Sequence, residues 1–165
     1  MGARAKAALW VVAGLIAVGT ASVVGTPAEA IDDELCGDIG LYIEGTEGAD
    51  YLVGTSGPDT IRGNGGDDII DGGGGADTII GGPGSDLLIG GDCDDTIRGN
   101  EDGDQIVGMD GDDEIHGNLG DDLMLGGRGA DTVDGGQGTD QCSDDPATDI
   151  NYIIYLISTV PTYPC

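Results

Sequence analysis

Residues 63–89 read GNGGDDIID, GGGGADTII and GGPGSDLLI, three successive blocks of nine residues that share one pattern. The block occurs eleven times without insertion or deletion, from Gly45 to Ser143, and we number these units 1 to 11. Gly fills the first position and Asp the sixth position of every unit, and the eighth position is always apolar. A short repeat of fixed length is typical of a solenoid, in which each unit stacks on its neighbours.

Each block predicts a turn followed by a short strand. Positions 1–6 are rich in Gly, Asp and Asn, which favour turns, and positions 7–9 form an extended segment whose middle side chain points inward. Two units make one coil, so we predict an all-β fold, a right-handed parallel β-roll (a β-solenoid) of eleven nonapeptide repeats with short terminal caps. Position 4 is Gly except at Cys93 and Asp102, in consecutive units, where we expect an irregular stretch.

The pattern G-G-x-G-x-D-x-U-x, in which U is apolar, resembles the RTX, or haemolysin-type, calcium-binding repeat. The resemblance covers residues 45–143 and implies a parallel β-roll with each calcium ion between one turn and the turn two units further on. Pairing turns in this way allows at most about nine Ca²⁺ ions. By motif position, the implied carboxylate ligands are Asp50, Asp59, Asp68, Asp77, Asp86, Asp95, Asp104, Asp113, Asp122, Asp131 and Asp140.

The chemistry of the block agrees with calcium, a hard cation that takes six to eight oxygen ligands, including carboxylates and backbone carbonyls. The alternative is that Asp and Gly only form turns, but turn propensity alone would accept Asn or Ser at position 6 in several units. An EF-hand does not fit. Its best window starts at Asp110, and Ile115 then stands where the sharp turn needs Gly.

The composition limits the classes of partner. The chain has 32 acidic and 5 basic residues, a net charge of −27, and no Phe. Such a chain repels itself and has little hydrophobic burial to offset the repulsion, so it is either disordered or ordered by bound cations. Nucleic acid and anionic membranes are disfavoured as partners.

The first 30 residues read as a secretory signal peptide, with Arg4 and Lys6 ahead of an apolar run and Ala28-Glu29-Ala30 as a cleavage site. The alternative is an uncleaved membrane anchor. After cleavage the chain would carry a net charge of −28 and would not associate with a membrane. We then expect a cap at 31–44, the β-roll at 45–143, and an apolar cap or lid at 144–165.

The two outer faces of the roll should differ. Odd units would expose an apolar row: Tyr51, Val53, Ile69, Leu87, Ile89, Val107, Leu123 and Leu125. Even units would expose a row of threonines. Such a row resembles an ice-binding surface, although Glu114 interrupts it. The apolar tail Tyr152–Ile157 could cover the odd face, and a homodimer or a cell-surface or matrix partner could use the same face instead.

Four cysteines in an exported protein suggest disulfides. We favour a Cys142–Cys165 pair, which would fasten the tail at the last coil. A Cys36–Cys93 pair is doubtful, because about three coils, or roughly 14 Å, separate Cys93 from the start of the solenoid. Free thiols at Cys36 and Cys93 are the alternative.

The flanks of the repeat are too short for a catalytic domain, and the single histidine, His116, stands at an outward position, so we do not expect an enzyme. The sequence predicts a secreted, extracellular or cell-surface-associated calcium-binding protein that folds when it binds Ca²⁺ in its Gly/Asp turns. The alternatives are a calcium-stabilised adhesive or matrix interaction module that acts through the apolar odd face, and a plain calcium buffer.

Overall fold

The structure, a computed structural model, describes residues 22–24 and 39–143, which form strands joined by turns. No helix in these described ranges is long and apolar enough to span a membrane. The strands are β1 (Ser22–Val24), β2 (Tyr42–Glu44), β3 (Tyr51–Val53), β4 (Thr60–Arg62), β5 (Ile69–Gly74), β6 (Thr78–Pro83), β7 (Leu87–Asp92), β8 (Thr96–Glu101), β9 (Gln105–Asp110), β10 (Glu114–Leu119), β11 (Leu123–Arg128), β12 (Thr132–Gln137) and β13 (Gln141–Ser143).

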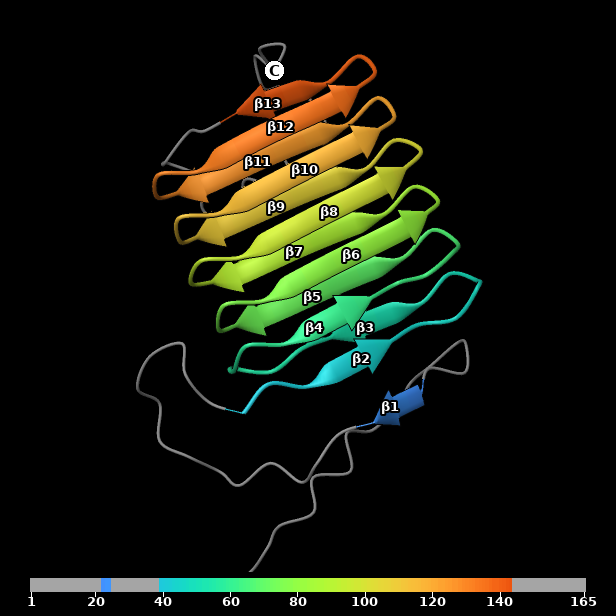
Figure 1. Cartoon of the computed structure of the whole chain (residues 1–165), viewed down its shortest axis with the longest axis vertical. Helices are drawn as coiled ribbons and strands as arrows, with labels where there is room; N and C mark the ends of the chain where they lie inside the picture. Colours follow the sequence, from blue (N-terminus) through green and yellow to red (C-terminus); the bar gives the residue numbers. More distant parts are fainter. Residues whose placement is uncertain (1–21, 25–38, 144–165) are drawn as a thin grey trace, which may run out of the picture.

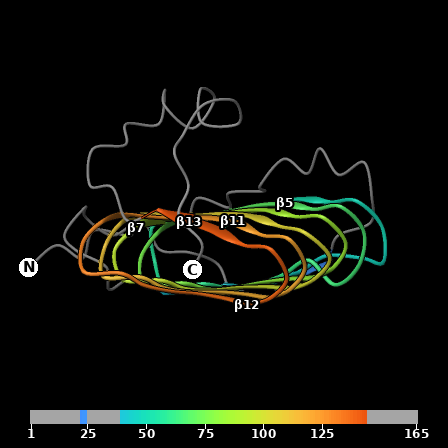
Figure 2. The same ribbon diagram turned by 90° about the horizontal axis from the view of Figure 1, so that it is seen from above.

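Successive strands alternate between two sheets. The even sheet has the order β1-β2-β4-β6-β8-β10-β12, and the odd sheet has the order β13-β11-β9-β7-β5-β3. From β2 onward, neighbours within a sheet are parallel and 18 residues apart, so that Ile79, Ile97 and Ile115 align. Figure 1 shows the stack of coils. Figure 2 shows the stack from above, where the two sheets form the long sides of a flattened cross-section. These observations confirm the predicted parallel β-roll and the sorting of units by parity.

The core consists of two facing rows of aliphatic side chains, one from each sheet. Its members from Ile61 to Ile97 have no exposed surface. The core comprises Ile43, Leu52, Ile61, Ile70, Ile79, Leu88, Ile97, Ile106, Ile115 and Met124, with Leu41, Val133 and Cys142 packed against it. Burying one such side chain contributes about 1.5–3 kcal/mol, so this thin core leaves much of the stability to the turns.

The strands are longer than the predicted three residues over most of the roll. From β5 to β12 each strand has six residues, because the ladder continues through positions 1–3 of the following unit. Gly73, for example, pairs with Gly91, and both have positive φ (96° and 126°). The predicted strand length is therefore wrong for these strands. The backbone bends at position 2 without leaving the sheet.

The stretch around Cys93 and Asp102 is regular, so the expected irregularity is wrong. Cys93 and Asp102 have φ of 86° and 69°, in the left-handed region that Gly occupies at the same position of the neighbouring units. Strands β6 to β11 pair without interruption through this stretch. The fold therefore imposes the turn conformation on residues that do not prefer it.

The outer face of the odd sheet is less exposed than predicted. Tyr51, Val53 and Ile69 are exposed (62%, 48% and 41%) near the N-terminal end of the roll. Val107 and Leu125, which are neighbours in register on the same row, are buried (7% and 6%). Leu87, Ile89 and Leu123 are half-buried. On this face, the apolar surface open to solvent is thus concentrated on β3 and β5.

At the N-terminal end, β1 pairs with β2 in antiparallel fashion, and Ile43 of β2 joins the core. Since β1 lies within the predicted signal peptide, cleavage after Ala30 would leave β2 as the edge strand. The predicted tail lid at 144–165 and the cysteines Cys36 and Cys165 lie outside the described residues. Of the described cysteines, Cys93 and Cys142, neither is a free thiol, which argues against the alternative of a free thiol at Cys93.

Candidate metal centre

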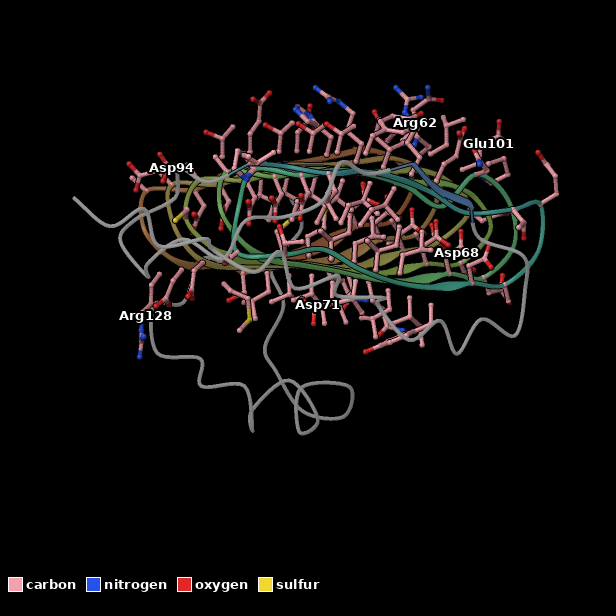
Figure 3. All side chains as sticks on the ribbon, turned by 90° about the horizontal axis from the view of Figure 1, so that it is seen from below. Arg62, Asp68, Asp71, Asp94, Glu101 and Arg128 are labelled. Carbon is pink, nitrogen blue, oxygen red and sulfur yellow. The ribbon has the colours of Figure 1, made fainter. Side chains whose placement is uncertain are left out.

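The Asp side chains of position 6 are folded into the turns at both edges of the roll. Nine of the eleven are buried: Asp50, Asp59, Asp68, Asp77, Asp86, Asp95, Asp104, Asp113 and Asp122. The last two, Asp131 and Asp140, are half-buried at the C-terminal end. In Figure 3 the side chain of Asp68 lies inside the flattened cross-section, whereas Arg62 and Asp71 point outward from opposite faces.

In units 3–11, one oxygen of the Asp at position 6 accepts a hydrogen bond in a ladder along the edge. The N–H of Asp77 donates to Oδ1 of Asp95, and the N–H of Asp95 donates to Oδ1 of Asp113, both at 2.8 Å. The same bond joins Asp residues 18 positions apart from Asp50 to Asp140. Because Oδ1 is held in this way, Oδ2 has a fixed direction in the turns of units 3–11.

The second oxygen accepts no hydrogen bond from the described residues in eight turns. These buried atoms are Oδ2 of Asp68, Asp77, Asp86, Asp95, Asp104, Asp113, Asp122 and Asp131. An unsatisfied buried acceptor costs about 1–3 kcal/mol, and more if it is charged. Two files of four such oxygens, one along each edge of the roll, therefore fit a positively charged ligand.

The space beside each Oδ2 is kept free by the Gly at position 1. A Cβ added at Gly81 would collide with Oδ2 of Asp86 and lie 3.0 Å from the carbonyl oxygen of Gly99, two units further on. Gly63 and Gly72 stand in the same relation to the carboxylates of their own units. The glycine thus leaves a cradle bounded by a carboxylate oxygen and a backbone carbonyl oxygen from the next coil.

The carboxylates in these cradles resist ionisation. Burial, opposed by the backbone hydrogen bond and assisted by neighbouring carboxylates, raises the pKa of Asp95 from 3.8 to about 8. The same causes raise the pKa of Asp77 and Asp104 to about 7 and that of Asp86 and Asp113 to about 6. A cation beside Oδ2 would remove the cost of the buried charge.

This donor set fits calcium. No three His, Cys, Asp or Glu side chains of the described ranges gather into a metal cluster, so carboxylates alone do not make a site. Carboxylate and backbone carbonyl oxygens of two stacked turns can provide the six to eight ligands that Ca²⁺ takes. The eight Asp residues whose Oδ2 atoms accept no hydrogen bond from the described residues are the side chains that would hold it. The ion would supply the positive charge that stabilises these buried carboxylates.

Units 1 and 2 are different, and the sequence interpretation missed this. Oδ2 of Asp50 accepts bonds from the N–H (2.5 Å) and the hydroxyl (2.8 Å) of Thr46. Oδ2 of Asp59 accepts bonds from the same two groups of Thr55, at 2.5 and 3.0 Å. The signal was present at position 2, where Thr occurs only in these two units.

A second, exposed ladder runs beside the first. Where Asp stands at position 5, its Oδ1 accepts the N–H of the residue 18 positions later, as Asp94 does from Asp112 at 2.8 Å. Asp67, Asp112 and Asp121 make the same bond. These carboxylates are exposed, so water solvates their remaining oxygens and no cation is required.

His116 lies apart from the turns. Its Nε2 is 2.8 Å from Oε1 of Glu114, and both residues belong to β10 on the even sheet. Thr60, Thr78, Thr96 and Thr132 form the predicted row beside them, interrupted by Glu114.

The sequence profile of the RTX calcium-binding nonapeptide repeat family matches residues 44–79, 71–106 and 107–142. These matches cover every turn with an unpaired Asp oxygen, and the family is defined by calcium binding rather than by a catalytic reaction. No curated protein and no solved structure matches the chain. The repeat, the parallel roll and the matched profile agree, and the chain belongs to the RTX calcium-binding nonapeptide repeat family.

Proposed function

We propose that this protein is an extracellular calcium-binding protein that folds as Ca²⁺ enters its Gly/Asp turns. The observation that carries the proposal is the set of eight buried Oδ2 atoms, four along each edge of the roll, that accept no hydrogen bond from the described residues. Bound cations would satisfy these atoms and reduce the self-repulsion of a chain with a net charge of −27. Metal binding and folding are then one event, because the turns of two coils must stack before the ligands converge.

Export is supported by the signal-peptide pattern of residues 1–30 and by the affinity range of calcium modules. Extracellular calcium modules bind with dissociation constants of about 10⁻⁴ to 10⁻³ M. A chain with such sites stays unfolded during export and folds outside the cell. The proposed role of the bound calcium is structural, because each ion would join the turns of two stacked coils.

Asp95→Asn tests the site directly. Asn keeps an oxygen that can accept the N–H of Asp77 but places a neutral NH₂ group where Oδ2 was. We expect the calcium concentration at half-folding to rise at least about tenfold, which corresponds to about 1.4 kcal/mol. Calcium titrations followed by circular dichroism measure this midpoint.

The matched control is Asp94→Asn, one residue earlier in the same turn. Asp94 is exposed and outside the cradle, as its place at the rim in Figure 3 shows, and Asn can keep its bond from the N–H of Asp112. Its midpoint should stay within about twofold of the unchanged chain. Equal effects of the two substitutions would mean that calcium responds to overall charge and not to the cradle.

A second candidate function is a calcium-stabilised adhesive or matrix module. The observation in its favour is the exposed group Tyr51, Val53 and Ile69 on the odd sheet. An exposed apolar group on a rigid sheet is a common interaction surface. In this function the calcium is structural, and the partner, either a second copy or a cell-surface molecule, packs on β3 and β5.

Removal of residues 144–165 distinguishes two hypotheses for the odd face: that the tail covers it, and that a partner binds it. If residues 144–165 cover the odd face, a chain ending at Ser143 should self-associate more than the full chain, because Val107 and Leu125 become exposed. Sedimentation velocity in saturating calcium measures the change. Unchanged sedimentation would exclude the lid.

A further inference from the structure

The turns of the roll fall into two backbone classes. In units 3–11 the residues at positions 2 and 4 both have positive φ. They are Asn64, Gly66, Gly73, Gly75, Gly82, Gly84, Gly91, Cys93, Asn100, Asp102, Met109, Gly111, Asn118, Gly120, Gly127, Gly129, Gly136 and Gly138. In units 1 and 2 none of the four equivalent residues, Thr46, Gly48, Thr55 and Gly57, has positive φ. The first two turns therefore have a different conformation, although their Gly and Asp positions match the pattern.

The class of each turn coincides with the state of its carboxylate. Every Asp with a buried Oδ2 that lacks a donor belongs to a turn of the first class. In the two turns of the second class, Oδ2 receives the backbone N–H and the hydroxyl of Thr46 or Thr55. The same hydroxyls accept the N–H of Gly48 and Gly57, at 3.3 and 3.1 Å, which braces the turn.

Threonine at position 2 explains the difference. A β-branched residue strongly disfavours the left-handed region that Gly, Asn and even Met109 occupy there. With negative φ, the N–H of Thr55 points at Oδ2 of Asp59 instead of away from it. The two donors carry positive partial charge and occupy the side of Oδ2 that a cation would need.

We propose that Thr46 and Thr55 take the place of calcium in units 1 and 2, so that Asp50 and Asp59 are structural acceptors and not metal ligands. This inference rests on the proposed calcium binding of the other turns. It reduces the upper bound of about nine ions to about seven, because the unit pairs 1–3 and 2–4 no longer count. It also makes the N-terminal coil a part of the roll that needs no calcium, on which the next coils can stack.

Thr55→Gly tests the proposal by gain of function. The substitution turns unit 2 into GGSGPD, which restores Gly at position 2, removes the hydroxyl and permits positive φ. The cradle is otherwise present, since a Cβ at Gly54 would meet both Oδ2 of Asp59 (2.6 Å) and the carbonyl oxygen of Gly72. We expect T55G to bind one calcium ion more than the unchanged chain. Ser56→Gly, an exposed position in the same turn, is the matched control and should bind the same number.

Asp59→Asn tests the proposal by the absence of a loss. D59N should bind as many ions as the unchanged full chain, whereas D95N should bind fewer. Bound calcium is counted by elemental analysis after equilibrium dialysis in saturating free Ca²⁺, and circular dichroism checks that each variant is folded. A lower count in D59N, or an unchanged count in T55G, overturns the proposal. If D59N does not fold, the T55G count decides alone. If the unchanged chain binds no calcium, the proposed function itself has failed.

Discussion

The chain without calcium is expected to lose its β structure at pH 7.5 and to recover it fully when calcium is returned. Its core has one aliphatic side chain per nine residues, which is little compensation for ordering the backbone of the whole unit. Without the ion, the eight buried Oδ2 atoms have no hydrogen-bond donor among the described residues to offset the cost of their burial. Far-UV circular dichroism during removal and return of calcium measures the transition, which should be the largest single effect available in this protein.

Magnesium is the control for this experiment. It is smaller than calcium, demands near-octahedral geometry and gives up its water reluctantly, so it should not fold the chain at equal concentration. A salt of equal ionic strength tests for simple charge screening. A spectrum that stays fully β-rich after calcium removal would contradict the proposed function.

Acidification should partly replace calcium. The pKa of Asp95 in the folded chain is about 8, and those of Asp77 and Asp104 are about 7, against 3.8 for an ordinary Asp. A folded-state pKa above the unfolded one means that the folded chain binds more protons. The stabilisation is therefore complete below about pH 4 and has been lost once the pH has risen through the folded-state pKa values of about 7 and 8. Between about pH 4 and its folded-state pKa, each such group lowers the free energy of unfolding by about 1.4 kcal/mol per pH unit as the pH rises.

We thus expect the calcium-free chain to be more β-rich and more resistant to urea at pH 5.5 than at pH 8.5. The calcium-loaded chain should show the opposite trend, because Ca²⁺ binds the ionised carboxylate and competes with the proton. Urea titrations at both pH values, with calcium removed beforehand by dialysis, measure the two slopes. A calcium-free chain that is less stable at pH 5.5 would mean that these Asp residues are not buried in the folded state.

The parallel register and the core could be predicted from the sequence because both depend on spacing alone. A nine-residue unit with one apolar residue at position 8 places Ile79, Ile97 and Ile115 in one file whatever the details of the turns. The position of the carboxylates follows for the same reason, since Asp at position 6 recurs with the same phase. The regular backbone at Cys93 and Asp102 shows that this phase dominates local preference.

What could not be predicted depends on the direction of single backbone groups. Whether Oδ2 of an Asp is satisfied depends on φ at position 2, and the pattern alone treats Thr55, Asn64 and Gly73 as equivalent. The burial of Val107 and Leu125 is a second example, because it depends on what surrounds each row and not on the alternation within a strand. The six-residue strands follow from pairing of glycines that turn propensity assigned to loops.

The 18-residue register between neighbouring strands also determines how such a protein can change length. Duplication or loss of one whole coil adds or removes 18 residues, lengthens or shortens the roll by about 4.8 Å, and leaves each face unchanged. Loss of a single nine-residue unit would instead exchange the faces beyond that point. The threonine row would then continue as the apolar row, and the two files of carboxylates would change edges. Insertions and deletions that preserve both surfaces must therefore add or remove an even number of units.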